Sequence, residues 1–458
     1  MVKRRPDVII SDLNSALVLI KEFPDRFIPY FDETFAGSRN IVSIGILKNL
    51  PSVSVLLSAT IPRLDEIPTI LNHFKERHHC GNESIVEVTS QRQHISCTVV
   101  GPDGCVYMPH NFVERHEDLL EYIQYIKMDP LKIRCYSPQI VYLMANHIQT
   151  DLPEELKFHN KFRNYGNVRH NDIREYAMEI LDFVARYGTE ELFQKLIQYH
   201  PEKIRNMEKQ HMLTENAFYY QDGNTLHISS YEDFTENSTL ITAPILDVAP
   251  KIKPVIEALK SRKEANDAEI QNIEEGNVVF RSRREKEEKL SELRNKVFRL
   301  NWSPQLVPNS LEHGRTFGRV IHNPSLALEI DIEQLKIINE SNAKLLLSGV
   351  GLYDPATLGR MNHAFNRFKN HLRFIFSTPA IIYGTNLSIT NVDVDDTFYK
   401  NATRNSIYQL MGRAGRRGKK TFNAMVVFHE WESLQLVMNK DYVDIEAREA
   451  EEIFSQIE

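Results

Sequence analysis

The fold is decided by two stretches, Phe27-Ile-Pro-Tyr-Phe-Asp-Glu33 and Val53-Ser-Val-Leu-Leu-Ser-Ala-Thr60. Each is a short apolar run that ends in acidic or small polar residues, which predicts a buried strand followed by a loop. A helical pattern over Asn14–Ile20 precedes the first run. Strands that alternate with helices predict a parallel α/β sheet, with functional residues at the carboxyl ends of its strands.

The same alternation extends over two further parts of the chain. Between about residues 84 and 144, and again after about residue 330, short apolar runs alternate with helical patterns. The expected strands are Val8–Ile10, Ser84–Val88, His94–Val100, Lys132–Cys135, Lys344–Leu347, Leu372–Phe376, Val392–Asp395 and Ala424–Phe428. The expected helices are Asp118–Lys127, one that opens at Ser137, Leu358–Asn370 and Ser406–Met411.

The middle of the chain has a different character. Residues 150–330 are polar, charged and helical in pattern, and predict a helical insertion into the α/β fold. Within them, apolar stripes at helical spacing predict an antiparallel coiled-coil hairpin over 252–300, with a turn at Glu274–Asn277. The charge run Arg281–Lys289 is interpreted as a solvated helix face rather than a binding site.

Composition argues against several classes of protein. The chain has 458 residues and a formal net charge of −7, which argues against a module that only coats nucleic acid. No apolar run is long enough to cross a bilayer. The spacings of the 4 cysteines fit neither a disulfide framework nor a zinc site, and favour a reducing intracellular compartment, cytoplasm or nucleus.

Two acidic residues, Asp32 and Glu33, follow the first strand. Adjacent carboxylates at a strand end suit nucleoside triphosphate hydrolysis, in which one orients Mg²⁺ and the other polarises the attacking water. The alternative is an acidic pair that only ends a strand. Further on, Ser58-Ala59-Thr60 offers small hydroxyls that would relay hydrogen bonds from such a site to a neighbouring domain.

The stretch Phe376–Leu387 carries further polar residues behind an expected strand. Its hydroxyls, an amide side chain and exposed backbone N–H groups would suit sugar–phosphate contacts that read no base. The residues concerned are Thr378, Gly384, Thr385 and Asn386. The alternative is a turn in which these polar residues are incidental.

The segment Gln409-Leu-Met-Gly-Arg-Ala-Gly-Arg-Arg-Gly418 places three arginines and three glycines beside a glutamine. Glycine lets the backbone approach a phosphate, and arginine binds phosphate oxygens in a planar fork. The segment therefore predicts an arginine finger aimed at a nucleotide γ-phosphate. The alternative is a basic turn on a solvated surface.

In their order and spacing these segments resemble the motifs of superfamily 2 DExH helicases, especially the Ski-type branch. Asp32-Glu33 resembles motif II, Ser58–Thr60 motif III, Phe376–Leu387 motif V and Gln409–Gly418 motif VI. Asp7–Asp12 is similar to motif Ib, and Arg134–Ser137 to the start of motif IV. The resemblance covers residues 7–60, 132–144 and 345–430.

The resemblance implies an ATP-dependent nucleic-acid helicase, with RNA favoured over DNA. It implies two RecA-like domains, each a parallel sheet sandwiched by helices. The expected division is 1–65 for part of the first domain, 66–149 and 331–440 for the second, 150–330 for the helical insertion and 441–458 for a tail.

The resemblance also implies roles for single residues. Asp32 and Glu33 would hold Mg²⁺, and Glu33 would be the general base. ATP would be bound by Asp32, Gly384, Gln409, Arg413 and Arg416, and the two arginines would stabilise the transferring phosphoryl group. Ser58, Ala59 and Thr60 would couple hydrolysis to domain closure. Single-stranded RNA or DNA would contact Ser11, Asp12, Ser137, Thr378, Thr385 and Asn386.

The chain departs from the family pattern at three points, one of which is the absence of the family's usual C-terminal helical domains after the segment that resembles motif VI. It contains no G-x-x-x-x-G-K-[ST] loop, without which ATP affinity and hydrolysis should collapse, and only 31 residues precede Asp32. It is therefore interpreted as an N-terminally incomplete helicase that is inactive by itself. Phe35 stands where related boxes carry histidine. The alternative is a non-catalytic scaffold that binds nucleic acid or, through its helical insertion, a protein partner; a membrane partner is not expected.

Overall fold

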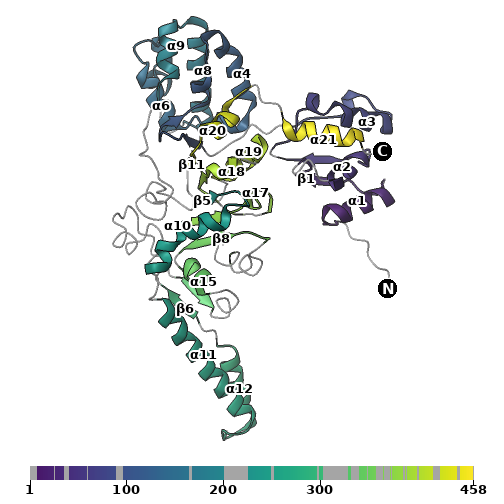
Figure 1. The fold of residues 1–458 in the computed structure, drawn as a ribbon, viewed down its shortest axis with the longest axis vertical. Helices are drawn as coiled ribbons and strands as arrows, with labels where there is room; N and C mark the ends of the chain where they lie inside the picture. The colour runs from purple at the N-terminus through teal and green to yellow at the C-terminus, as the bar shows by residue number, and fades with distance from the viewer. Residues whose placement is uncertain are drawn as a thin grey trace.

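The chain forms an α/β fold of two units, seen side by side in the computed structural model (Figure 1). The structure describes residues 8–24, 26–35, 41–58, 60–88, 96–163, 168–200, 225–248, 252–296, 299–302, 328–331, 340–347, 349–356, 365, 372, 374–384, 387, 389–399, 402–415, 423–440 and 444–456. Among these residues, no helix combines the length and the apolar content needed to cross a membrane.

The smaller unit, called the N-terminal unit below, contains a two-stranded parallel sheet. Strand β1 (Tyr30–Asp32) pairs with β2 (Val55–Leu57). The helices of this unit are α1 (Leu13–Glu22), α2 (Ile41–Lys48), α3 (Pro68–His78) and α21 (Ile445–Gln456). One core joins them, so the yellow helix α21 packs among the purple first elements of the chain (Figure 1).

Helix α21 corrects the expectation of a tail over 441–458. Ala447, Ala450 and Phe454 are each at most 4% exposed and belong to the core of the N-terminal unit. Their spacing of three and four residues places them on one helix face, which buries against the unit. Helix α3 belongs to the same core, so the N-terminal unit also extends past the expected boundary at residue 65.

The larger unit is built on a seven-stranded sheet in the order β4-β3-β11-β10-β5-β9-β8. Neighbouring strands run parallel except at the edge pair β3–β4. The strands are β3 (Ser96–Val100), β4 (Val106–Tyr107), β5 (Thr225–Ile228), β8 (Val350–Tyr353), β9 (Phe374–Ser377), β10 (Asn391–Val394) and β11 (Asn423–Phe428).

Helices cover both faces of this sheet, as expected for parallel strands. Val426 and Phe428 pack towards α17 (Ile381–Gly384), α19 (Arg404–Arg413) and α20 (Trp431–Met438). Val427, which points the other way, packs towards α10 (Phe234–Val248) and α15 (Glu340–Leu347). A separate helical layer beside β4 has its own core and consists of α4 (Leu119–Met128), α6 (Pro138–His147), α8 (His170–Tyr187) and α9 (Glu190–Ile197).

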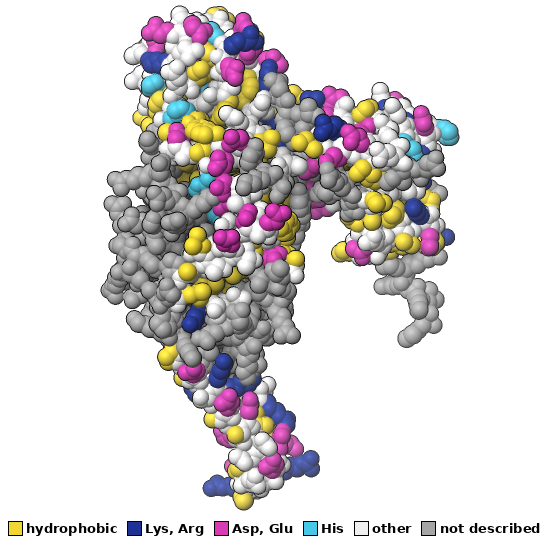
Figure 2. All heavy atoms as spheres, in the orientation of Figure 1, with side chains coloured by type: hydrophobic (Ala, Val, Ile, Leu, Met, Phe, Trp, Pro, Cys, Tyr) yellow, Lys and Arg dark blue, Asp and Glu magenta, His cyan; other side chains and the backbone are white. Residues whose placement is uncertain are grey.

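Helices α11 (Ile252–Glu274) and α12 (Arg283–Arg294) form the lower end of the molecule in Figure 1. Asn266 Nδ2 donates to the carbonyl oxygen of Leu293 at 3.2 Å, so the two helices pack together. Figure 2 shows acidic and basic side chains mixed along them, and Arg283 and Arg284, 92% and 88% exposed, pair with glutamates four residues on. This confirms the solvated-face interpretation of the charge run.

Several expected elements differ in the structure. The hairpin expected over 252–300 ends earlier, because α12 stops at Arg294. Leu300 lies instead in strand β6 (Arg299–Trp302), which pairs antiparallel with β7 (Leu328–Asp331). Lys344–Leu347, expected as a strand, belongs to α15. A run of three leucines fits a buried helix face as well as a strand.

The expected strand Lys132–Cys135 is also helical, in α5 (Pro130–Ile133) and the turn after it. The Asp129 carboxylate accepts from the N–H groups of Leu131 at 2.9 Å and Lys132 at 3.2 Å, and Pro130 occupies the first helical position. This is a helix start signal that overrides the apolar pattern.

Strand β5 corrects the expectation that residues 150–330 form a helical insertion into the sheet. It lies between β10 and β9 inside the main sheet, with all four residues buried. Two other expected strands are absent from the described residues. Val8–Ile10 is irregular and exposed. In Ser84–Val88, the first residue ends a 3₁₀ helix (Asn82–Ser84) and the rest is irregular. Most of the expected helix Leu358–Asn370 lies outside the described residues.

Candidate functional site

Glu33 lies in the turn that follows β1. Its φ of 55° is left-handed, a conformation that residues other than glycine adopt rarely and that recurs at functional sites. The backbone N–H of Glu33 donates to the carbonyl oxygen of Leu57 at 2.7 Å, which extends the pairing of β1 with β2. This pairing places Glu33 beside the end of β2.

The residues after β2 hold the Glu33 carboxylate. Ser58 Oγ donates to Glu33 Oε2 at 2.6 Å and accepts from the N–H of Thr60 at 3.0 Å. The hydroxyl oxygens of Ser58 and Thr60 are 3.4 Å apart. Because neighbouring parallel strands end at the same edge of a sheet, the acidic and the hydroxyl residues meet there. Ala59 lies outside the described residues.

Gln409 reaches this group from the larger unit. It lies on α19 and is 4% exposed. Its Nε2 donates to Glu33 Oε2 at 2.6 Å, and it lies 3.2 Å from Thr60 Oγ1 and 3.3 Å from Ser58 Oγ. Gln409 and Glu33 are 376 positions apart, so only the tertiary structure brings them together.

Arg413 is the last residue of α19 and is 6% exposed. Its guanidinium donates to the carbonyl oxygen of Ile382 in α17. The chain then turns at Gly415, whose φ is 69° and whose N–H donates to the carbonyl oxygen of Ile389 at 2.7 Å. These hydrogen bonds fix the C-terminal end of α19 to the larger unit. Arg416, the second expected finger, lies outside the described residues.

The structure describes only some of the residues after Phe376 that are expected to bind a nucleic-acid strand. Thr378 follows β9, is 1% exposed, and donates its N–H to the carbonyl oxygen of Tyr353 at 3.2 Å. Gly384 ends α17. Thr385 and Asn386 lie outside the described residues. Thr378 is thus buried beneath the surface, and its placement does not support a direct contact with a nucleic-acid backbone.

Two other residues expected to contact nucleic acid, Asp12 and Ser137, cap helices. Asp12 Oδ1 accepts from the N–H of Ser15 at 3.0 Å and begins α1, and this bond holds the pKa of Asp12 below its usual value. Ser137 is 2% exposed and caps α6 by accepting from the N–H of Ile140 at 3.3 Å. A buried cap does not present its hydroxyl to a partner, so Ser137 has a structural role in place of the expected contact. Ser11 is exposed before α1.

Asp32 and Glu33 differ in what they offer a metal. Asp32 is exposed, whereas Glu33 Oε2 already accepts from Ser58 and Gln409. Mg²⁺ takes oxygen ligands and usually combines one or two carboxylates with water and substrate phosphates, a requirement that Asp32 fits. Within the described part of the chain, no group of three or more His, Cys, Asp or Glu side chains could hold a metal. Phe35, in the histidine position of related boxes, is a core residue.

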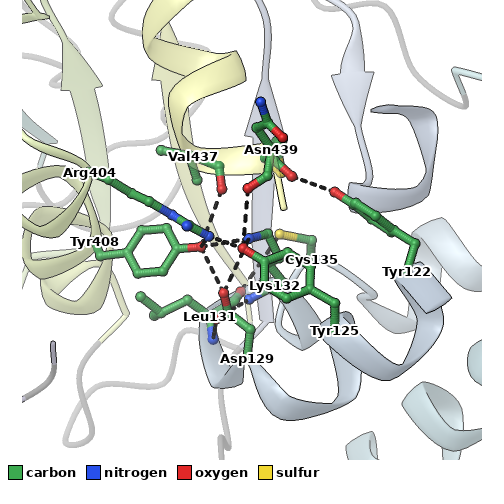
Figure 3. Close-up of polar contacts among 11 residues, drawn as sticks. Tyr122, Tyr125, Asp129, Leu131, Lys132, Cys135, Arg404, Tyr408, Val437 and Asn439 are labelled. Atoms are coloured by element: carbon green, nitrogen blue, oxygen red, sulfur yellow. Dashed lines mark hydrogen bonds and ion pairs between the residues drawn. The ribbon is translucent and has the colours of Figure 1, made fainter. Parts of the chain in front are cut away.

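A buried polar cluster, which sequence patterns did not predict, lies at the N-terminal end of α19 (Figure 3). Lys132 is 1% exposed, and its Nζ donates to Tyr125 Oη at 2.6 Å and to Tyr408 Oη at 2.7 Å. Asp129 Oδ2 lies 3.3 Å from the same ammonium, and Arg404 donates to both tyrosine hydroxyls. Burial lowers the pKa of Lys132 to about 7.

This cluster ties α19 to the helices of the larger unit. Tyr408 Oη donates to Asp129 Oδ2 at 2.7 Å and contacts the carbonyl oxygen of Val437, at the end of α20, at 3.2 Å. Tyr125 Oη contacts the carbonyl oxygen of Asn439 at 3.2 Å. The one signal in the sequence is the capping pair Asp129-Pro130; nothing in it shows that Tyr408 would join.

A second polar cluster lies on β5 and β10 and on the residues that directly follow β10 and β11. His227 on β5 lies 2.6 Å from Asp393 and 3.3 Å from Asp395, and His429 lies 2.6 Å from Asp393. Burial lowers the pKa of His227, but hydrogen bonds to the two carboxylates and their charges outweigh it and raise this pKa to about 9. Burial raises the pKa values of Asp393 and Asp395, but the imidazoles hold both below the usual range.

No protein-family model and no curated protein sequence matches the chain. The function therefore has to be argued from the residues themselves. Among the residues predicted from the sequence, Glu33, Ser58, Thr60 and Gln409 are the described ones that meet across the two units.

Proposed function

We propose that this chain belongs to an ATP-dependent nucleic-acid helicase of the DExH type, acting on single-stranded RNA or DNA with RNA favoured. The observation that carries the proposal is the hydrogen bond from Gln409 Nε2 to Glu33 Oε2 at 2.6 Å. It joins the segment that resembles motif VI to the one that resembles motif II, with Ser58 and Thr60 of the third motif between them. A chance likeness of short segments would not require them to meet in space.

In the proposed reaction Glu33 is the general base. A carboxylate that accepts from a hydroxyl and an amide is held in one orientation, as proton abstraction from a positioned water requires. Asp32 would hold Mg²⁺, which when bound supplies positive charge beside the phosphates. Gln409 would exchange its bond to Glu33 for the nucleotide, and Arg413 would leave the carbonyl of Ile382 to reach the transferring phosphoryl group.

The proposal assigns the two units to RecA-like domains. The seven-stranded sheet, parallel but for one edge and covered by helices on both faces, would be the second such domain. The N-terminal unit would be part of the first, and its parallel pair β1–β2 would carry the acidic and the hydroxyl motif. Ser58 and Thr60 would couple hydrolysis to movement of the units, because Ser58 contacts both Glu33 and Gln409, and Thr60 contacts Ser58 and Gln409.

The test addresses the missing phosphate-binding loop. Because the sequence contains no G-x-x-x-x-G-K-[ST], we expect the chain alone to show no strand-stimulated ATP hydrolysis. The chain is then expressed together with a loop-bearing polypeptide encoded upstream or in a neighbouring gene, and phosphate release is measured with and without poly(U) RNA or oligo(dT). We expect RNA-stimulated release, which Glu33→Gln reduces by roughly 10²–10⁴-fold.

Glu76→Gln is the matched control, since Glu76 is an exposed residue of α3 in the same unit. It should leave the release unchanged. Hydrolysis by the chain alone that Glu33→Gln abolishes would contradict the expected inactivity. If the combined polypeptides release no phosphate from ATP with or without RNA, the proposed function is wrong.

A second candidate function is a non-catalytic scaffold. The absence of the loop from this sequence favours it. The pair α11 and α12 would serve as the surface for a protein partner, with Val278 and Val279 in its turn 41% and 95% exposed. The contact between Glu33 and Gln409 favours the helicase, because a scaffold has no need to join these two residues.

A further inference from the structure

Helix α21 contacts both units of the molecule. On the N-terminal unit, Phe454 packs edge-on against His73 with ring centroids 5.2 Å apart. The carboxylate of Glu451 accepts from the N–H groups of Thr69 and Ile70, each at 2.9 Å, in the first turn of α3. A carboxylate at a helix N-terminus satisfies N–H groups that have no partner within the helix and meets the positive end of its dipole.

On the larger unit, α21 meets α19 at a reciprocal pair of helix caps, called the helix junction below. Thr403 caps α19 and donates its hydroxyl to Glu446, the second residue of α21, at 2.5 Å. Asp444 caps α21 by accepting from the N–H of Ala447 at 3.0 Å and also accepts from Asn405, the second residue of α19, at 2.8 Å. Each helix thus uses its cap to hold the second residue of the other.

The helix junction is buried, so the loss of one of its hydrogen bonds costs more free energy than the loss of an exposed one. Asn405 and Glu446 are each 7% exposed, and Asn405 Nδ2 also lies 3.3 Å from Glu446 Oε2. A buried carboxylate is costly unless hydrogen-bonded, and breaking one side of such a contact leaves the other side unsatisfied. The arrangement therefore resists separation of α19 from α21.

Helix α19 divides its contacts between two faces. Arg404 and Tyr408, four residues apart, belong to the buried cluster of the larger unit. Asn405 and Gln409, also four residues apart, share the neighbouring face and contact α21 and Glu33. Residues at this spacing lie one above the other on a helix, so a shift of the helix junction moves Gln409 with it.

We propose that α21 is a clasp: through the helix junction it holds α19 at a fixed position relative to the N-terminal unit and so aligns Gln409 with Glu33. Thr403, Asn405, Asp444 and Glu446 are positioning residues. The consequence for hydrolysis rests on the proposed function. The positioning itself does not, because it concerns two helices and two units without a nucleotide.

The test measures the distance between the units in the full chain without nucleotide. Spin labels are placed at Glu76→Cys in α3 and Gln124→Cys in α4, both exposed, after Cys80→Ser and Cys105→Ser remove the partly exposed thiols. Double electron–electron resonance gives the distance distribution, and circular dichroism checks folding. We expect one narrow distance with the clasp intact and a second, longer one in Asn405→Ala and in Glu446→Ala.

Removing one side of a buried hydrogen bond should raise the ratio of open to closed molecules roughly 5- to 100-fold. Glu446→Gln should restore the narrow distance, because an amide oxygen still accepts from Thr403. Glu452→Ala, on the exposed side of α21, is the matched control and should match wild type. If Glu446→Ala does not fold, Asn405→Ala carries the comparison.

Unchanged distances in the folded junction variants would overturn the clasp, as would an equal change in Glu452→Ala. Absence of phosphate release by the chain with the loop-bearing polypeptide would refute the proposed function but would not change the distances expected for the clasp. The two proposals therefore fail separately.

Discussion

Lys132 illustrates how one buried residue makes stability depend on pH. Burial lowers its pKa from 10.5 to about 7, so between these values the unfolded chain binds more protons than the folded chain, and this residue makes unfolding harder as the pH rises. We expect wild type to gain stability relative to Lys132→Met between pH 7 and pH 9, by roughly 1 kcal/mol per pH unit. Urea titrations at several pH values measure the difference.

Lys127→Met provides the control at the residue scale, because Lys127 is an exposed lysine of α4. Its difference from wild type should stay constant over the same range. A constant difference for Lys132→Met as well would mean that Lys132 remains charged in its site.

At the scale of an element, β5 contributes a charge to the middle of the sheet. The pKa of His227 is raised from 6.5 to about 9, so the stability it contributes is fully present below pH 6.5 and is lost as the pH rises through about 9. We expect His227→Asn to lower the free energy of unfolding by roughly 3–5 kcal/mol at pH 6, because two buried carboxylates lose their cation. Thermal and urea unfolding measure this loss.

The loss in His227→Asn should shrink above pH 9, where wild type also lacks the charge. This trend is opposite to that for Lys132, so the two clusters can be separated in one set of titrations. His159→Asn changes an exposed histidine and should leave stability unaltered. A loss that does not vary with pH would show that His227 acts by packing alone.

At the scale of the whole molecule, α21 makes the N-terminal unit depend on residues more than 400 positions away from its first helix. Phe454 is 4% exposed in that core. We expect Phe454→Ala to destabilise the N-terminal unit by roughly 3–5 kcal/mol and the main sheet far less. Hydrogen exchange should accelerate in α2 and α3 while amides of β9 and β10 keep their protection.

Ser455→Ala is the neighbouring control, on an exposed position of the same helix. It should leave exchange in both units unchanged. If Phe454→Ala accelerated exchange equally in both units, they would form a single cooperative body rather than two joined by α21.

The strands show why prediction from sequence succeeded for some elements and failed for others. The predicted strand Ala424–Phe428 agrees with β11 almost to the residue, because a buried parallel strand needs a continuous apolar run. The predicted strand Val392–Asp395 agrees with β10 to within one residue at each end, although its two valines alternate with aspartates. Thr225–Ile228 was missed because it is short and carries threonine and histidine, whose burial depends on Asp393 and Asp395 from another strand. The prediction of a strand over Lys344–Leu347 is wrong because three leucines in a row suit a helix equally well.

By itself the sequence determined the α/β alternation and the candidate residues Asp32, Glu33, Ser58, Thr60 and Gln409, because periodicity and residue chemistry are local properties. Only the tertiary structure decided that Gln409 meets Glu33 and that α21 returns to the N-terminal unit. It also decided that Ser137 and Thr378 are buried. The physical reason is that hydrogen bonds and burial depend on distance in space, and no local pattern encodes which residues the folded chain brings within 3 Å of each other.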